Sequence, residues 1–286
     1  MQNAAIKLIE CPRDAMQGWP HFIPTEKKIK YLNELLKVGF HTLDFGSFVS
    51  PMAIPQMADT KEVIGSLKLG NTQTKLLAII ANLRGATEAC SFDQISYLGF
   101  PFSISETFQQ RNTNSSVDES LQRVEDIQEL CVKSKKELVV YISMGFGNPY
   151  GDAYNEEIVL KRTKQIRDLG INIISIADTV GLATANDVRV LMNKLIPEFP
   201  QTEIGVHLHS APADRVAKIE AALAAGCTRF DSAVKGIGGC PMAGNDLLGN
   251  MDTEAMVNYL KQKDFTLNLD ADALTACHKL ADEIFV

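Results

Sequence analysis

Residues 172–226 read NIISIADTVGLATANDVRVLMNKLIPEFPQTEIGVHLHSAPADRVAKIEAALAAG, and this stretch decides the fold class. Two short apolar runs, 172–177 and 203–208, are each followed by a segment with helix signals. Thr184 and Ser210 are the expected N-caps of those two helices, and Gly226 stands just past the end of the second. Near-continuous apolar strands that alternate with amphipathic helices are typical of a parallel sheet covered by helices.

The same alternation runs through the whole chain. Eight strands are expected, at 6–10, 41–45, 76–81, 95–99, 138–143, 172–177, 203–208 and 228–234. A helix is expected to open on Thr25 and stop at Gly39, and the capping box Ser116-x-x-Glu119 is expected to open another. Eight such units in 286 residues favour a (β/α)₈ TIM barrel, class α/β, as a single domain over 1–286, with an extra helix within 252–286. An open doubly wound sheet is the alternative, weakened because no GxGxxG follows the first strand.

Composition limits the classes of partner. A 45% hydrophobic and 22% charged composition is that of a globular protein with a sizeable core. The net charge of −7 argues against nucleic acid or an anionic membrane as the main partner. Six cysteines without CxxC spacing fit a reducing compartment, and no leader or membrane-spanning run is recognisable. We therefore expect a soluble cytoplasmic protein.

Polar residues cluster where the expected strands end, which is the catalytic rim of such a barrel. His207 and His209 stand two apart in one strand, so their side chains share a face. Two neutral imidazoles there make a pair of metal ligands, although two core histidines bonded to backbone carbonyls explain an isolated HxH equally well. The other rim candidates are Arg13, Asp14 and Gln17 after the first strand, Asp44 after the second, Asn82 after the third, Asp178 and Thr179 after the sixth, and the loop 236–250 after the eighth. Helix or turn capping explains each of them singly but not their joint occurrence at one rim.

These residues belong to a longer series of motifs. PRDAMQ, SFVSPMAIPQM, SETFQQRNTN, PYG, ADTVG, VHLH and GIGGCPMAGNDLLGN occur in this order between about residues 6 and 260. The series resembles the 3-hydroxy-3-methylglutaryl-CoA lyases, a family of the DRE-TIM metallolyases. The PRDxxQ and HxH pair is shared with isopropylmalate and homocitrate synthases, whereas the GGCP loop points to the lyase branch. The glutamate–arginine pair usual in that loop of the synthases is not found here.

The resemblance implies a retro-Claisen cleavage of an acyl-CoA to acetyl-CoA and acetoacetate, a step of leucine catabolism, by a homodimer. It implies a divalent metal, usually Mg²⁺ or Mn²⁺, held by four residues: Asp14, His207, His209 and Asn250. Asn245 competes with Asn250 because the loop is one residue longer than the family form. Imidazole ligands equally tolerate zinc or iron, so the ligand types leave the metal open.

The resemblance also implies roles in the reaction. Arg13 would stabilise the enolate oxygen, and Cys240, in the loop that follows the glycine run 236–239, would protonate the enolate carbon. Asp44 and Asp178 are the further catalytic candidates, Asp178 as an additional proton handler. The expected substrate contacts, besides Arg13, are Gln17, Asn112, Tyr141, Ser143 and Thr179. The glycine run suits a phosphate cradle or a mobile lid, and Arg111 and Lys235 could meet CoA phosphates, with a solvated surface role as their default.

Three departures from the family bear on substrate specificity. Asp44 replaces a glutamate, Ser210 replaces an aspartate after HxH, and GWPHFIP at 18–24 replaces a charged stretch, which puts Trp19 and His21 near the expected mouth. Two other functions therefore stay open. One is a synthase that condenses an acyl-CoA with a 2-oxo acid, and the other is a barrel that only binds metal or ligand.

Overall fold

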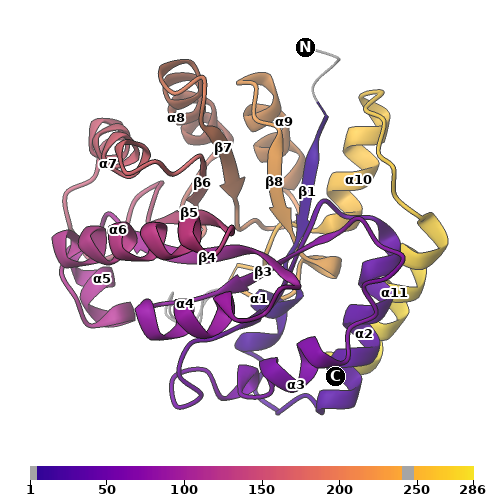
Figure 1. Ribbon diagram of the computed structural model, residues 1–286. Helices are drawn as coiled ribbons and strands as arrows, with labels where there is room; N and C mark the ends of the chain where they lie inside the picture. The colour runs from indigo at the N-terminus through magenta and orange to yellow at the C-terminus, as the bar shows by residue number, and fades with distance from the viewer. Residues whose placement is uncertain (1–4, 240–247) are drawn as a thin grey trace.

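A closed barrel of parallel strands forms the centre of the molecule (Figure 1). The structure, a computed structural model, describes residues 5–239 and 248–286. The strands are β1 (Lys7–Glu10), β2 (Thr42–Ser47), β3 (Lys75–Ile79), β4 (Ile95–Ser103), β5 (Glu137–Ser143), β6 (Ile173–Ala177), β7 (Glu203–His207) and β8 (Arg229–Ser232). Each pairs in parallel with the next, and β1 also pairs with β8, as in Leu8 with Phe230. The predicted barrel is confirmed, and the open sheet is wrong.

Helices surround the barrel (Figure 1). They are α1 (Pro12–Gln17), α2 (Thr25–Val38), α3 (Thr60–Gly65), α4 (Leu83–Cys90), α5 (Glu106–Thr113), α6 (Val117–Lys133), α7 (Glu156–Asp168), α8 (Ala185–Glu198), α9 (Arg215–Ala224), α10 (Thr253–Gln262) and α11 (Ala271–Ile284). Helix α1 lies directly at the carboxyl end of β1 (Figure 1). Short 3₁₀ turns lie at Pro55–Met57 and Val234–Gly236. The extra C-terminal helix expected within 252–286 is α11, which packs against α2.

Most of the predicted helix ends are observed. Ser116 caps α6 with both hydrogen bonds of the capping box, and Thr184 caps α8 in the same way. Helix α2 begins at Thr25 and stops at Gly39, whose φ of 90° suits a residue without a Cβ.

The prediction that Ser210 caps the following helix is wrong. Helix α9 begins only at Arg215, with Asp214 at the N-cap position. Pro212 is the physical reason, because a proline disfavours the helical conformation of the residue before it. The amide of Ser210 instead donates to the carbonyl of Gly249 at 3.0 Å, so Ser210 joins the rim to the loop that follows β8.

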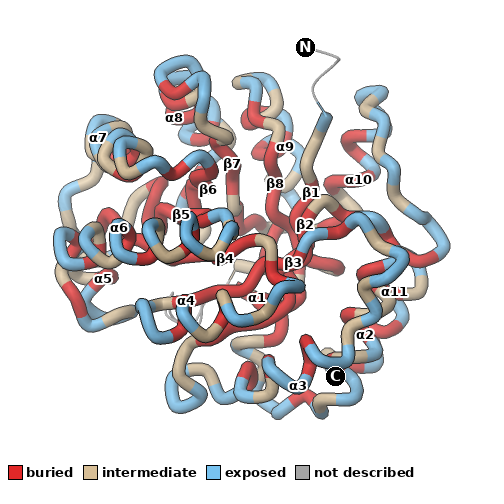
Figure 2. The backbone as a smooth tube through the Cα atoms, in the orientation of Figure 1, coloured by how far each residue is buried: buried red, intermediate tan, exposed pale blue. Residues whose placement is uncertain are grey.

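The strands and the inner faces of the helices are buried (Figure 2). Strand β4 runs past the expected end at residue 99 to Ser103, because its ladder with β5 continues to the pair Ser103 and Ser143. No helix in the described part of the chain is long and apolar enough to cross a membrane. The closed ladder holds the strand ends in fixed relation to one another, and the functional side chains follow those ends.

Candidate functional site

A cavity of about 470 Å³ lies at the carboxyl ends of the strands. Ten of the residues predicted from the sequence line it: Arg13, Asp14, Gln17, Asp44, Asn112, Tyr141, Ser143, Thr179, His207 and His209. Apolar side chains from β3, the loop after β2 and helix α5 line another part of the wall, among them Val49, Ile79 and Phe108. The cavity therefore combines a polar cluster with an apolar wall, the usual make-up of a small-molecule site.

Asp14, His207 and His209 form the polar centre of this cavity. One ligand atom from each lies within 4.8 Å of the other two, which is close enough for a single metal ion. Asp14 comes from the first turn of α1 directly after β1, whereas His207 ends β7 and His209 follows two residues later. The strand alternation that suggested a shared face for the two histidines is thus confirmed.

Asn250 reaches the same cluster from the loop after β8. Its amide nitrogen donates to Oδ2 of Asp14 at 2.9 Å and to the carbonyl oxygen of Ile237 at 2.9 Å. An isolated antiparallel bridge between His209 and Asn250 holds the two backbones together. Gly238 closes over Asp14 at φ +95°, where an added Cβ would lie 2.8 Å from the Asn250 amide nitrogen. One glycine of the expected run is therefore needed for this close approach.

Each of the two histidines has a ring nitrogen placed to bind a cation. Nε2 of His209 is buried without a hydrogen-bond partner in the described residues, and such an orphaned atom marks a place for a ligand. Burial and the neighbouring His207 lower the pKa of His209 to about 4, so its ring is neutral. Nδ1 of His207 lies 3.1 Å from Oδ2 of Asp231, whereas Nε2 lies on the side of Asp14, 4.0 Å from its Oδ2. Burial opposes protonation of His207, but Asp231 and Asp14 outweigh burial and raise its pKa, so its ring binds a cation only in the neutral form. Two imidazole nitrogens and a carboxylate oxygen fit a divalent metal.

Arg13 and Asp44 form an ion pair beside this cluster. Nη2 of Arg13 donates to Oδ2 of Asp44 at 2.6 Å and Nε donates to the same oxygen at 3.0 Å, while Nη1 donates to Asp14 at 2.9 Å. Burial works against the charge of Arg13, but Asp44 and Asp14 outweigh it and raise its pKa. Burial raises the pKa of Asp44 to about 6 although Arg13 opposes the shift. The aspartate that replaces the family's glutamate therefore still reaches the arginine.

Two predicted rim residues have structural partners instead. Asp178 does not line the cavity: Lys218 contacts its carboxylate at 3.3 Å, and the amide of Ala183 donates to it at 3.1 Å. The chain turns directly after β6, and Thr179 lines the cavity whereas Asp178 contacts Lys218 of α9. Asn82 caps α4 by accepting from the amide of Gly85 at 2.9 Å.

Other predicted positions fall outside the cluster. Cys240 and Asn245 lie outside the described residues. Arg111 lines the cavity and lies over the ring of Tyr150 at 4.7 Å, whereas Lys235 pairs with Asp282 away from the cavity. Trp19 lines the mouth, but His21 is not among the lining residues.

Two buried carboxylates were missed by sequence reasoning. Asp231 on β8 stands in register with His207 on β7, so the partner of His207 comes from the next strand. Glu10 ends β1 and accepts from the Val234 amide at 2.8 Å and the Thr253 hydroxyl at 2.6 Å. The sequence signal that could have identified them is a lone acidic residue inside or at the end of an apolar strand. Such a residue indicates a functional or structural partner, because a buried charge needs one.

A closed (β/α)₈ barrel with an Asp–His–His cluster at the carboxyl ends of its strands defines the class of metal-binding barrel enzymes. Within that class, a family model described as HMGL-like matches residues 6–281, so the chain belongs to this family. The lyase family named from the sequence motifs is thereby confirmed.

Individual relatives agree with this assignment. Hydroxymethylglutaryl-CoA lyase YngG of Bacillus subtilis is 31% identical over 95% of this chain and 90% of its own length. The crystal structure of the HMG-CoA lyase of Bacillus subtilis has a TM-score of 0.92 at 30% identity, covering 98% of this chain and 93% of that one. An HMG-CoA lyase from Acinetobacter baumannii, solved in complex with coenzyme A and 3-methylmalate, has a TM-score of 0.90 at 29% identity, covering 98% and 91%.

Proposed function

We propose that the protein is a divalent-metal-dependent carbon–carbon lyase that cleaves 3-hydroxy-3-methylglutaryl-CoA to acetyl-CoA and acetoacetate. The observation that carries the proposal is the cluster of Asp14, His207 and His209, with the unpartnered Nε2 of His209, beside Arg13 in one cavity. Membership of the HMGL-like family supports it, as do relatives named for this activity. The relative that holds coenzyme A and 3-methylmalate supports an acyl-CoA substrate.

The residues of the cavity suit the chemistry of this cleavage. Asp14, His207, His209 and Asn250 would hold the divalent metal, Mg²⁺ or Mn²⁺, which would make the tertiary hydroxyl of the substrate more acidic. Arg13, oriented by its hydrogen bonds to Asp44, presents a fixed positive charge to the enolate oxygen as the carbon–carbon bond breaks. Cys240 delivers the proton that the enolate carbon needs. Gln17 keeps Asp14 in place by donating to its Oδ1 at 2.8 Å.

The central experiment incubates the purified protein with 3-hydroxy-3-methylglutaryl-CoA and Mg²⁺ or Mn²⁺ and measures acetoacetate. We expect acetoacetate with metal and none after chelation. A parallel incubation with acetyl-CoA and 2-oxo acids tests the condensing alternative. Condensation without cleavage would contradict the lyase, and no reaction of either kind would leave only the metal-binding barrel.

The metal ligands have their own test. Asp14→Ala and His207→Ala should each abolish metal-dependent activity and measurable Mn²⁺ binding by calorimetry, while circular dichroism stays near that of the unchanged protein. The fold should persist because these residues lie at the rim of the barrel and not in its apolar core. Unchanged Mn²⁺ affinity in either variant would show that the ligand assignment is wrong.

A homodimer and a cytoplasmic location remain our predictions for the assembly and its compartment. Light scattering at working concentration checks the first, and a monomer there would contradict it. Fractionation of the source cells checks the second.

A further inference from the structure

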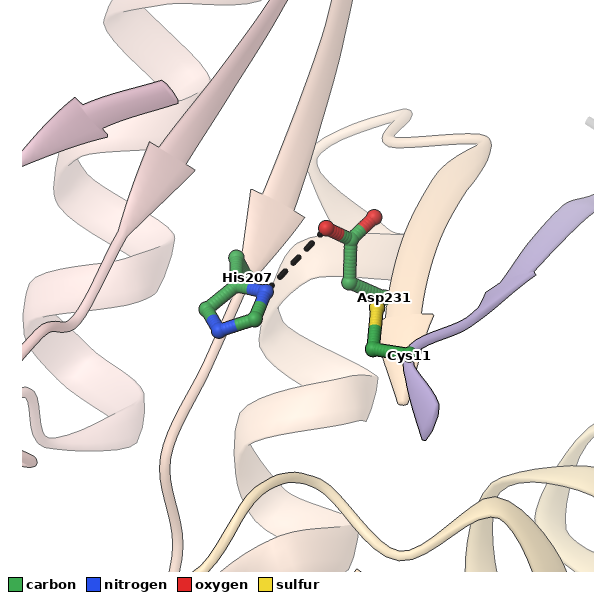
Figure 3. Close-up of side chains that lie close together, drawn as sticks. All are labelled: Cys11, His207 and Asp231. Atoms are coloured by element: carbon green, nitrogen blue, oxygen red, sulfur yellow. Dashed lines mark hydrogen bonds and ion pairs between the residues drawn. The ribbon is translucent and has the colours of Figure 1, made fainter. Parts of the chain in front are cut away.

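A second cluster of ligand-type side chains, Cys11, His207 and Asp231, shares His207 with the first (Figure 3). Cys11 follows β1, His207 ends β7 and Asp231 lies on β8, and one ligand atom of each lies within 4.8 Å of the others. The ring nitrogen that faces Asp231 is Nδ1, at 3.1 Å from Oδ2. Cys11 and Asp231 are only 1% and 2% exposed, and of the three residues only His207 lines the cavity.

The chemistry of this cluster differs from that of the cavity. Thiolate, imidazole and carboxylate together are ligands of Zn²⁺ and of softer divalent ions, whereas Mg²⁺ and Mn²⁺ prefer oxygen. Oδ1 of Asp231 and the hydroxyl of Tyr141 are buried without a hydrogen-bond partner in the described residues. Arg229, whose positive charge acts on Asp231, is itself paired with Glu203 at 3.1 Å. The cluster thus has unused ligand capacity and a neighbouring cation that is already partly neutralised.

We propose that Cys11, Nδ1 of His207 and Asp231 form a second metal site, for a thiophilic divalent ion such as Zn²⁺ or Cd²⁺. Occupation of this site excludes metal from the Asp14–His207–His209 cluster. The reason is the tautomer of His207: a neutral imidazole has one nitrogen lone pair, which serves either Nε2 or Nδ1 but not both. When the His207 ring is neutral, the Cys11 thiol releases its proton to solvent and the ring proton moves from Nδ1 to Nε2 through solvent. One proton is then released for each ion bound.

The first experiment titrates the metal-free protein with Cd²⁺ and follows the sulfur-to-cadmium charge-transfer absorption in the ultraviolet. The band should appear in the unchanged protein and in Cys240→Ser, and it should be lost in Cys11→Ser. Cys131→Ser, which alters a buried thiol on α6, is the matched control and should keep the band. Loss of the band in Cys240→Ser but not in Cys11→Ser would overturn the proposal.

Cys11→Ala provides a second variant should the serine disturb the fold, with circular dichroism as the measure of folding. Both variants should weaken Zn²⁺ binding at least ~10-fold by calorimetry, since even loss of a residue that only supports a ligand costs ~10–100-fold in metal affinity. Zn²⁺ affinity equal to that of the unchanged protein in a folded variant would show that Cys11 is no ligand.

The second experiment tests whether Zn²⁺ at the second site excludes metal from the Asp14–His207–His209 cluster. Only this part of the proposal rests on the proposed function. Bound Mn²⁺ is followed by electron paramagnetic resonance while Zn²⁺ is added. In the unchanged protein we expect one Zn²⁺ to release one Mn²⁺. In Cys11→Ser the same release should require a Zn²⁺ concentration at least ~10-fold higher, because this variant binds Zn²⁺ more weakly. Simultaneous binding of both ions would overturn exclusion. Absence of Mn²⁺ binding would contradict the proposed catalytic site, while the cadmium band would still decide the second site.

Discussion

At the scale of single residues, His207 shows how burial directs chemistry. Its Nδ1 faces Asp231, which favours the tautomer with the proton on Nδ1, and this leaves the lone pair of Nε2 for the cavity. Burial opposes protonation of His207, but its hydrogen bond to Asp231 and the charges of Asp231 and Asp14 outweigh burial and raise its pKa. His209 stays neutral because burial and its neighbour His207 lower its pKa to about 4. The two histidines at the end of β7 therefore differ in how readily they take up a proton.

Asp231→Asn tests the role of that carboxylate as a positioning residue. An asparagine amide can donate to Nδ1 and so favours the tautomer with the proton on the wrong nitrogen. We expect Mn²⁺ affinity to fall ~10–100-fold, as for other residues that orient a metal ligand. Calorimetry measures the affinity, and the exposed Asp118→Asn is the control. Affinity within twofold of the control would mean that Asp231 does not orient His207.

Cys240→Ser separates binding from chemistry. Serine keeps the size of the side chain but raises the pKa of the donor far above the ~8.5 of a thiol. Loss of a proton donor should lower kcat by ~10²–10⁴, with KM and Mn²⁺ affinity little altered. Steady-state kinetics and calorimetry on the same preparation measure both. Turnover near that of the unchanged protein would exclude the thiol as donor.

At the scale of elements, Glu10 joins the start of the barrel to its end. Its carboxylate at the end of β1 receives hydrogen bonds from Val234 after β8 and from Thr253 at the first turn of α10. Burial raises the pKa of Glu10 to about 8, because the hydrogen bonds that favour the charged form do not compensate for the loss of solvent. The junction between first and last strand is therefore sensitive to pH.

The sign of that dependence follows from the direction of the shift. Between the unfolded pKa of 4.5 and the folded pKa of about 8, the folded state keeps a proton that the unfolded chain has released. The contribution of Glu10 to the free energy of unfolding is fully present below the lower value and is lost as pH rises to the upper one. The change amounts to on the order of a few kcal/mol.

Glu10→Gln should flatten the pH dependence of stability. Glutamine can accept from Val234 and donate to Thr253 at every pH, so it mimics the protonated acid. Urea unfolding at intervals between pH 5 and 8 measures the effect, with the exposed Glu62→Gln on α3 as control. Parallel pH profiles for Glu10→Gln and the control would show that the junction does not titrate in this range.

At the scale of the whole molecule, the C-terminal helix returns to the mouth of the cavity. Helix α11 packs on α2, and Phe285, directly after α11, contacts the ring of Trp19 at a centroid distance of 5.2 Å and that of Tyr31 at 6.3 Å. Trp19 itself lines the cavity. Helix α11 therefore supports the part of the cavity wall that Trp19 forms, in the loop between α1 and α2.

Phe285→Ala should loosen this wall. Loss of a half-buried aromatic ring and its edge-on contacts should lower the free energy of unfolding by ~1–3 kcal/mol. The fluorescence of Trp19, the only tryptophan, should change in the folded state as its surroundings become wetter. Val286→Ala, at a position that is 82% exposed, is the control. Identical fluorescence and stability in the two variants would mean that α11 does not support the mouth.

Fold class and most of the site were readable from local sequence. Strands buried on both faces appear as continuous apolar runs, so β5 and β6 were located to within a residue at each end. Asp14, His207 and His209 were predicted because parallel strands end at one rim, and the N-caps Ser116 and Thr184 because the signals for a helix start are local. Each of these features depends on residues close together in the chain.

Other features depend on contacts between segments far apart in sequence. Asp231 meets His207 across 24 positions, and Glu10 meets Thr253 across 243, so neither partner is visible in a local pattern. Asp178 was expected at the cavity, but the direction of one side chain beyond a strand end depends on where Lys218 packs. The reason is physical: a buried polar group is directed by the partner that satisfies it, and folding alone brings that partner near.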